Sequence, residues 1–441
     1  MTVRVTWLAL EERLQHEFRQ LTEEGHDPGD LQRIWDRSAG EQPAERQAMA
    51  ARLLDQAREL SGTDAGLQNP IAGVPQTPRP VPADLERRVL AGWTGRMAGC
   101  LLGKPVEKIP REGIRAILQS SGQWPLHDYF TAEGVPLEVL EQYPWNRASR
   151  PTSLRENITC MPEDDDINYS MLNLSVLETA GPDFTTEDVA SAWLTMLPAL
   201  TTFTAERVAY QNLLERVEPP ETALHRNPYR EWIGAQIRAD VWGWVCPGDP
   251  ARAAEYARRD ARLSHIGNGL WAEMYVAAMV ASACVQDDVQ KVIQAGLAVI
   301  PGDSRLAEAV RFVTEVHRQE PDWERAVDQL YQRYGHYHWV HAINNAALVT
   351  AALLYGEGDF TRSICLAVMG GWDTDSNGAT VGSVVGTLRA EVPVRWALPL
   401  HGQVRSSMRG FDLASLEDLA RRTVAQVRPA EGQTGGACIR P

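Results

Sequence analysis

The stretch GGWDTDSNGAT at residues 370–380 places Asp373 and Asp375 two positions apart, and Ser376 and Asn377 follow directly. A turn usually needs only one such side chain, so this concentration of oxygen atoms indicates another purpose. Carboxylates and hydroxyls are the ligands that Mg²⁺ and Mn²⁺ prefer. The stretch therefore indicates a metal site, and helix capping is the alternative interpretation of this stretch taken alone.

An EF-hand calcium loop is the first metal site to consider. Asp373, Asp375, Asn377 and Gly378 match its oxygen-bearing positions and its glycine. The loop must close with a bidentate glutamate, but the chain has Val384 there, within an apolar run. The EF-hand is thus excluded. What remains is a helix start, where alternate residues of a turn can direct both carboxylates at one point beside a hydroxyl.

A second acidic group occurs in MPEDDDINYSMLNL at residues 161–174, where Glu163, Asp164, Asp165 and Asp166 are consecutive. One or two acids at a helix start are stabilised by the helix dipole by about 0.3–1 kcal/mol each, and this is the alternative without function. Four adjacent carboxylates repel each other, and burial adds several kcal/mol per unpaired ion unless a cation neutralises them. Two groups of acids suit two divalent cations.

The elements that must position these acids are predicted to be helices. From residue 84 onward the apolar residues recur with helical periodicity, and strand-length segments of alternating β-branched residues are almost absent. Gly378, Gly382 and Gly386 share one helical face, which favours the close approach of a neighbouring helix. The fold class is therefore predicted to be all-α, with one large helical domain over residues 84–428.

The ends of the chain are predicted to lie outside this domain. Residues 1–61 are expected to form an N-terminal helical extension, with amphipathic helices at 9–24 and around 44–60 that serve docking or self-association. A segment rich in proline and glycine at 62–83 is expected to be a linker. Residues 429–441 are expected to form a flexible tail.

The composition excludes several classes of protein. The chain has 441 residues, of which 43 are basic and 58 acidic, and it has no run of lysine or arginine, so direct nucleic-acid binding is not expected. Its six cysteines are scattered, which argues against thiolate zinc sites and a disulfide framework and favours a cytoplasmic location. No stretch stays apolar long enough to span a membrane, and no membrane partner is expected.

Three motifs together resemble the ADP-ribosylglycohydrolase family, over roughly residues 88–390. GRMAGCLLGKPVE at 95–107 is similar to the opening helix and loop of that family, which ends in a glutamate near the metals and the substrate, here Glu107. EDDDINYSMLNL lies where relatives carry Thr-Asp-Asp-Thr. GGWDTDSNGATVGSVVG lies where they carry Gly-x-Asp-x-Asp-Thr and a helix of small residues. The last motif is the most specific of the three.

The resemblance implies an orthogonal multi-helix bundle of the ADP-ribosylglycohydrolase type with a binuclear Mg²⁺ site, for which Mn²⁺ is an alternative. It implies the metal ligands Glu163, Asp164, Asp165, Asp373, Asp375 and Ser376. It also implies the catalytic residues Asp164, Asp165, Glu107 and Asp373. Asp164 or Asp165 is the expected base for the attacking water, and Glu107 a gating or proton-transfer group. These roles stay open at the level of sequence.

Two further segments are candidates for substrate binding. RLSHIGNGLWAEM is similar to a Thr-His segment of the family, which predicts that His265 and Asn268 face the cleft. HYHWVHAINNAALV places His341, Asn344 and Asn345 within one turn, where they are predicted to hold a phosphate, a ribose or the metal ligands. The alternatives are a structural role for each histidine and helix capping by the asparagines.

The implied activity is hydrolysis of an N- or O-glycosidic bond at ribose C1 of ADP-ribosylated substrates, whether small molecules or proteins. Glu163 stands where the family usually has threonine, Cys100 where many relatives have aspartate, and Asp166 replaces the second threonine. These departures indicate a divergent branch. Two alternatives therefore stay open, a ribosyl hydrolase acting on a free nucleotide or nucleoside and a non-catalytic ADP-ribose-binding protein. A dimetal phosphohydrolase is disfavoured because no histidine accompanies either acidic group.

Overall fold

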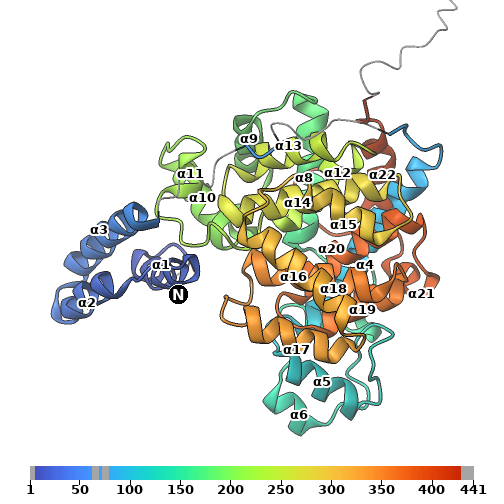
Figure 1. Ribbon diagram of the computed structural model, residues 1–441, viewed down its shortest axis with the longest axis horizontal. Helices are drawn as coiled ribbons and strands as arrows, with labels where there is room; N and C mark the ends of the chain where they lie inside the picture. The colour runs from blue at the N-terminus through green and yellow to red at the C-terminus, as the bar shows by residue number, and fades with distance from the viewer. Residues whose placement is uncertain (1–4, 62–68, 72–78, 429–441) are drawn as a thin grey trace, which may run out of the picture.

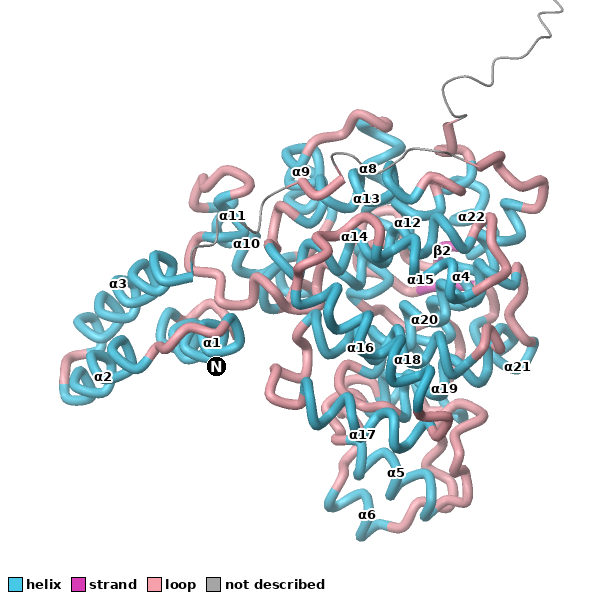
Figure 2. Tube along the Cα trace, in the orientation of Figure 1, coloured by secondary structure: helices cyan, strands magenta, loops and turns pink. Residues whose placement is uncertain are grey.

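The computed structural model describes residues 5–61, 69–71 and 79–428. Part of the predicted linker and the whole predicted tail at 429–441 lie outside the described residues. Within the described residues the chain is almost entirely helical (Figure 2), and the strands are limited to β1, Gln403–Val404, and β2, Ala414–Ser415, paired antiparallel. The prediction of an all-α fold is confirmed.

The N-terminal extension forms the helices α1 (Leu10–Glu24), α2 (Gly29–Arg37) and α3 (Pro43–Ser61), with a short η1 turn at Ser38–Gly40. We call residues 5–61 the arm. The two predicted helices are present, and α2 lies between them. The arm has a small apolar core of its own, which includes Phe18 and Trp35. In Figure 1, α1 lies beside the body of the protein, α2 lies farthest from it, and the end of α3 returns toward α11 (Glu221–Leu224), where Arg58 pairs with Glu221.

Two helices, α4 (Leu85–Gly103) and α20 (Thr374–Arg389), form the centre of the body. Their backbones touch: a Cβ atom on Gly99 would overlap the carbonyl oxygen of Gly378, and one on Gly382 would overlap that of Gly95. The predicted glycine face of α20 is therefore used for close packing, and its partner is a glycine face on α4. The antiparallel contact brings the end of α4 to the start of α20.

Other helices surround this pair (Figure 1). They are α5 (Arg111–Ser120), α6 (Leu137–Gln142), α7 (Arg150–Ser153), α8 (Asp165–Ala180), α9 (Thr186–Met196), α10 (Thr204–Leu214), α11 (Glu221–Leu224), α12 (Asp240–Trp244), α13 (Pro250–Ala261), α14 (Gly267–Ala283), α15 (Val289–Leu297), α16 (Arg305–Gln319), α17 (Trp323–Tyr334), α18 (Ala342–Gly356), α19 (Phe360–Met369), α21 (Val394–Ala397) and α22 (Leu416–Val424). Short 3₁₀ turns are η3 (Lys104–Val106), η4 (Arg155–Asn157), η5 (Ala199–Thr201), η6 (Gln236–Arg238) and η7 (Leu398–Leu400).

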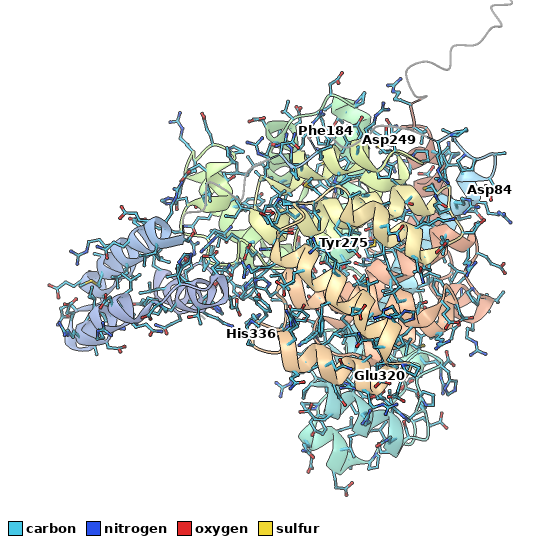
Figure 3. The ribbon with its side chains drawn as sticks, viewed as in Figure 1. Asp84, Phe184, Asp249, Tyr275, Glu320 and His336 are labelled. Atoms are coloured by element: carbon cyan, nitrogen blue, oxygen red, sulfur yellow. The ribbon has the colours of Figure 1, made fainter. Side chains whose placement is uncertain are left out.

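The core lies around α14 and α18, which are apolar and buried on nearly all sides, as expected for helices in the middle of a large bundle. Tyr275 of α14, labelled in Figure 3, is fully buried, and its hydroxyl lies 2.9 Å from Oγ1 of Thr350 on α18. None of the helices in the described part of the chain is long and apolar enough to cross a membrane.

Candidate active site

The two acidic groups of the sequence line the same pocket, which has a volume of about 640 Å³. Every residue of the predicted metal-ligand set borders this pocket, together with Asp166 and Glu107. Groups that are far apart in the chain are therefore brought together by the fold.

The central helix α4 holds the starts of α8 and α20 at this pocket. Arg96 of α4 donates a hydrogen bond from Nε to the backbone oxygen of Asp166 at 3.0 Å. Thr374 donates from Oγ1 to the backbone oxygen of Gly103 at 2.8 Å. Two helix N-termini thus meet here, and the partial positive charge of each stabilises nearby carboxylates.

The carboxyl groups of Asp373 and Asp375 are buried and hydrogen-bonded to each other. Within the described residues neither carboxyl has a basic side chain within 4.0 Å, whereas both keep the pocket on one side. Burial, followed by the charges of neighbouring carboxylates, raises the pKa of both groups. A hydrogen bond between two carboxyls requires a proton on one of them. A divalent cation would replace that proton and relieve the repulsion.

Asp166 links the two acidic groups directly. Its Oδ2 accepts a hydrogen bond from Ser376 Oγ at 3.1 Å, and its Oδ1 lies 3.3 Å from Arg96. Arg96 also forms an ion pair with Asp240, in which Nη1 lies 2.6 Å from Oδ2. Burial, then the charge of Asp164, raises the pKa of Asp166 well above its ordinary value. Asp166 was absent from the predicted ligand set, although its place beside Asp165 was a signal for it.

Asp164 has a basic partner that was not anticipated from the sequence. One of its oxygens caps α8 by accepting from the backbone N–H of Asp166 at 3.0 Å, and the other pairs with Nζ of Lys104. Lys104 is only 7% exposed. Burial by itself would lower the pKa of this lysine, but the charge of Asp164 outweighs burial and raises it. The ammonium group is therefore charged and neutralises Asp164.

Glu163 borders the pocket, but its carboxylate is hydrogen-bonded to other protein groups, and its role as a metal ligand stays a prediction. Its side chain is exposed, and Oε1 accepts from the backbone N–H of Ser407 at 2.8 Å and from Asn168 at 3.1 Å. The reason is that the segment after β1 runs beside this part of the chain, since Arg405 donates its backbone N–H to the backbone oxygen of Met161 at 2.8 Å. The carboxylate is held on that segment.

Cys100 of α4 is fully buried, and its sulfur lies within 4.8 Å of carboxylate oxygens of Asp164 and Asp166, a grouping that could hold a metal ion. Burial, and then these two carboxylates, raises the pKa of the Cys100 thiol well above its ordinary value. The sulfur therefore stays a protonated thiol in the metal-free protein. Hard oxygen atoms remain the main donors of the site.

Glu107 borders the pocket just after η3. Its carboxylate accepts a hydrogen bond from Asn146 at 2.7 Å and pairs with Lys108 at 3.1 Å. Burial, then the charge of Asp375, raises the pKa of Glu107 to about 7. A carboxyl group with such a pKa can both give and take a proton near neutral pH.

His265 and Asn268 do not face the pocket, contrary to the prediction. His265 is fully buried, and its Nδ1 lies 2.8 Å from Ser264 Oγ. Asn268 donates to Glu231 at 2.6 Å and accepts from the backbone N–H of Leu306 at 3.0 Å. Both side chains are used inside the fold, and Asn268 joins the start of α14 to Glu231 and to the start of α16.

The segment with His341, Asn344 and Asn345 also has internal roles, and none of the three borders the pocket. Asn344 donates to the backbone oxygen of His338 at 3.2 Å. Asn345 comes closest to the predicted role of holding the metal ligands, because its Oδ1 accepts a hydrogen bond from the backbone N–H of Asp373 at 3.2 Å. It positions the turn before α20 and does not border the pocket.

His341 caps α18, since its Nδ1 accepts from the backbone N–H of Ile343 at 3.2 Å. This hydrogen bond requires a neutral ring, and burial lowers the pKa of His341 to about 3. An unfolded histidine takes up its proton near pH 6.5. Between these two pH values the unfolded state binds more protons, so stability falls as the pH falls, by up to about 1.4 kcal/mol per pH unit.

We expect the variant His341→Asn to lose this part of the acid sensitivity, because asparagine can still cap the helix but does not titrate. The free energy of unfolding, measured in urea between about pH 6 and pH 4, should then fall less steeply than in the wild type. The exposed His336 provides the matched control, and His336→Asn should keep the wild-type slope. An unchanged slope in His341→Asn would contradict this account.

An aromatic wall completes the pocket and was not predicted. The residues in it are Trp7, His16, Phe203, Trp232, His338 and Trp339. The content of 14 tryptophans was the only signal in the sequence, and it could not say which of them border the pocket.

Among the comparisons with known proteins, a family model agrees with the motifs. A family model described as ADP-ribosylglycohydrolase matches residues 81–432. An uncharacterized protein from Archaeoglobus fulgidus is 24% identical over 309 residues, which covers 68% of this chain and 88% of that protein. A solved structure named "ADP-ribosylglycohydrolase-related protein complex" superposes with a TM-score of 0.48 at 21% identity, over 78% of this chain and 99% of that one.

Proposed function

Because the chain belongs to the ADP-ribosylglycohydrolase family, we propose that it hydrolyses an N- or O-glycosidic bond at C1 of a ribose unit. The observation that carries this proposal is the meeting of the acidic starts of α8 and α20 in one pocket. Hydrolysis at this carbon passes through an oxocarbenium-like state. The site must therefore orient the sugar, deliver a water molecule and help the leaving group to depart.

The charges around the pocket support a binuclear site. Asp165, Asp373 and Asp375 have no basic partner within 4.0 Å among the described residues, whereas Lys104 neutralises Asp164. Arg96 pairs with two carboxylates, those of Asp166 and Asp240. Its single positive charge can neutralise only one of them, which leaves one further negative charge uncompensated. With all groups ionised, four charges are uncompensated, and two divalent cations would neutralise them.

The ligands that fit this charge balance are Asp165, Asp166, Asp373, Asp375 and Ser376. This set omits Glu163 and Asp164 from the expected one and adds Asp166, as a shift of one residue in the alignment of the acidic motif at 163–166 would explain. A threonine that starts a helix is a typical N-cap, and in this chain the N-cap of α8 is Asp164. Asp164 would then correspond to the threonine of the family, and Asp165 and Asp166 to its two aspartates.

Two Mg²⁺ or Mn²⁺ ions bound by these residues would hold the ribose hydroxyls and lower the pKa of a water molecule. Asp165 is the better base for that water, because Asp164 is already paired with Lys104. Glu107, with its pKa near neutrality, is suited to exchange a proton with the leaving group. The roles of Asp373 and Asp375 are to bind metal and to direct the remaining ligands.

Two classes of substrate are candidates, ADP-ribosylated proteins and free ribosyl nucleotides or nucleosides. The arm favours the second class, because Trp7 and His16 border the pocket from outside the main helical domain. A pocket of about 640 Å³ is of the size that encloses a small ligand.

The experiment is a pair of assays with the full chain in Mg²⁺ and in Mn²⁺. One measures release of ADP-ribose from modified protein, and the other measures release of the base from small N-ribosides. Metal-dependent turnover in either assay supports a glycohydrolase, and the better substrate identifies the class. Tight binding of ADP-ribose without turnover would instead indicate a non-catalytic ADP-ribose-binding protein.

A further inference from the structure

The arm reaches the candidate active site although it lies outside the matched region, which begins at residue 81. Trp7 precedes α1 and His16 lies on α1, and both border the pocket that holds the acidic groups. Part of the pocket wall is therefore supplied by a segment that the family domain does not include.

Buried ion pairs hold α1 against the body. Glu17 of α1 lies 2.8 Å from Arg230, and both side chains are 4% exposed. Glu24 pairs with the same arginine at 3.0 Å. Arg19 donates to the backbone oxygen of His336, which is labelled in Figure 3 where the arm meets the body, at 3.1 Å. Because such pairs are specific in geometry, they fix the direction in which α1 presents its side chains.

The side chains that α1 brings to the pocket join aromatic residues of the body. The ring of His16 stands edge-on to Trp232 at 5.4 Å between centroids, and Trp232 stacks on His338 at 4.0 Å. Trp7 contacts Phe203 at 5.6 Å, and Phe203 is still 40% exposed. The result is an apolar, aromatic wall in the same pocket as the carboxylates.

His16 has unused hydrogen-bonding capacity at this wall. In the part of the chain that the structure describes, its ring nitrogens make no hydrogen bond to protein, and the residue is half-buried. Burial lowers the pKa of His16, so the ring is neutral at pH 7 and has one donor and one acceptor nitrogen. A ligand with both acceptor and donor atoms on a flat ring would match it.

We propose that the arm completes a subsite for a planar heteroaromatic ring of the substrate, with Trp7 and His16 as its contacts. The ring would lie on the aromatic wall, and the ribose hydroxyls would lie at the carboxylates. This inference rests on the proposed function, because it takes the substrate to contain a ribosyl unit. The arm would thereby select substrates by the ring attached to the ribose.

The test compares ligands that differ only in the presence of a ring. AMP, UMP, nicotinamide mononucleotide and ribose 5-phosphate are titrated into the full-length protein in Mg²⁺ by isothermal titration calorimetry. We expect at least one ring-bearing compound to bind about tenfold more tightly than ribose 5-phosphate, as base stacking on aromatic side chains allows. The three rings distinguish a purine, a pyrimidine and a pyridinium as the preferred group.

Variants of the arm then test whether Trp7 and His16 cause the preference for ring-bearing compounds. Trp7→Ala and His16→Ala should each remove most of the preference for the ring and leave the affinity for ribose 5-phosphate unchanged, while Trp7→Phe should retain most of it. The exposed neighbour Gln15 serves as the control, and Gln15→Ala should behave as the wild type. A general loss of affinity for all four compounds in the variants would indicate a merely structural arm.

Equal affinity of all four compounds for the wild type, absence of binding by all of them, or a preference that survives both alanine variants would each overturn the inference. None of these readouts requires hydrolysis. A protein that prefers ring-bearing compounds but turns over no riboside would reject the proposed function and keep the subsite.

Discussion

Replacing Asp375 with asparagine is expected to abolish turnover and, at the same time, to make the metal-free protein more stable. Asp375 is buried beside Asp373 and near Asp164, and burial, then the charge of Asp164, raises its pKa and so disfavours its ionised form. Without a cation, the neutral asparagine removes repulsion, and we expect Tm in EDTA to rise by about 2 °C or more. With the cation, the loss of an anionic ligand should lower turnover by about 10³-fold or more.

Two measurements check this expectation for Asp375→Asn. Thermal unfolding with and without Mg²⁺ should show a metal-induced increase in Tm for the wild type that the variant lacks. Calorimetric titration with Mn²⁺ gives the same comparison as a binding isotherm. A variant that keeps metal-dependent turnover would remove the basis of the site assignment.

Glu163 supplies the matched control, because it is the predicted ligand that Ser407 and Asn168 hold on another segment. Glu163→Gln should keep both metal binding and the metal-induced increase in Tm. If Glu163→Gln lost metal as Asp375→Asn is expected to do, the ligand set expected from the sequence would be the better one.

Replacing Lys104 with methionine is expected to destabilise the metal-free protein by about 3–5 kcal/mol, because it leaves the buried Asp164 without a partner. Adding Asp164→Asn to Lys104→Met removes the unpaired charge and should restore most of the lost stability. The free energy of unfolding in urea with EDTA measures both effects. Lys104→Arg retains a charge and serves as the conservative comparison.

The variant with both Lys104→Met and Asp164→Asn also decides how the acidic motif at 163–166 aligns with the Thr-Asp-Asp-Thr of the family. If Asp164 is the helix cap and Asp165 and Asp166 are the ligands, the double variant should bind Mg²⁺ and retain turnover. If Asp164 is a ligand, the double variant should be stable but unable to bind metal. The same protein therefore separates a role in folding from a role in metal binding.

Much of the architecture could be predicted because it depends on local patterns. Helical periodicity predicted an all-α body, and Gly378 and Gly382 predicted a closely packed face on α20, which lies against α4. The three motifs and their order predicted the family, and the family model matches most of the chain. These features are read from residue type and spacing, which do not depend on what lies across the fold.

The details of the pocket could not be predicted, because neighbours in the chain can point in very different directions. Successive residues at a helix start differ by about 100° in direction. Glu163 and Asp166 are only three positions apart, yet Glu163 is held by Ser407 after β1 and Asp166 contacts Ser376. His265 and Asn268 were expected at the pocket, but His265 contacts the adjacent Ser264 and Asn268 contacts Glu231 inside the fold.

The amino-acid sequence by itself determined that this chain is helical, that it carries two concentrated groups of carboxylates, and which family it belongs to. Only the tertiary structure decided which carboxylates have a basic partner, because that depends on Arg96 of α4 and Lys104 of η3. It also decided that the arm borders the pocket, since ion pairs between α1 and Arg230 connect segments that no local pattern relates.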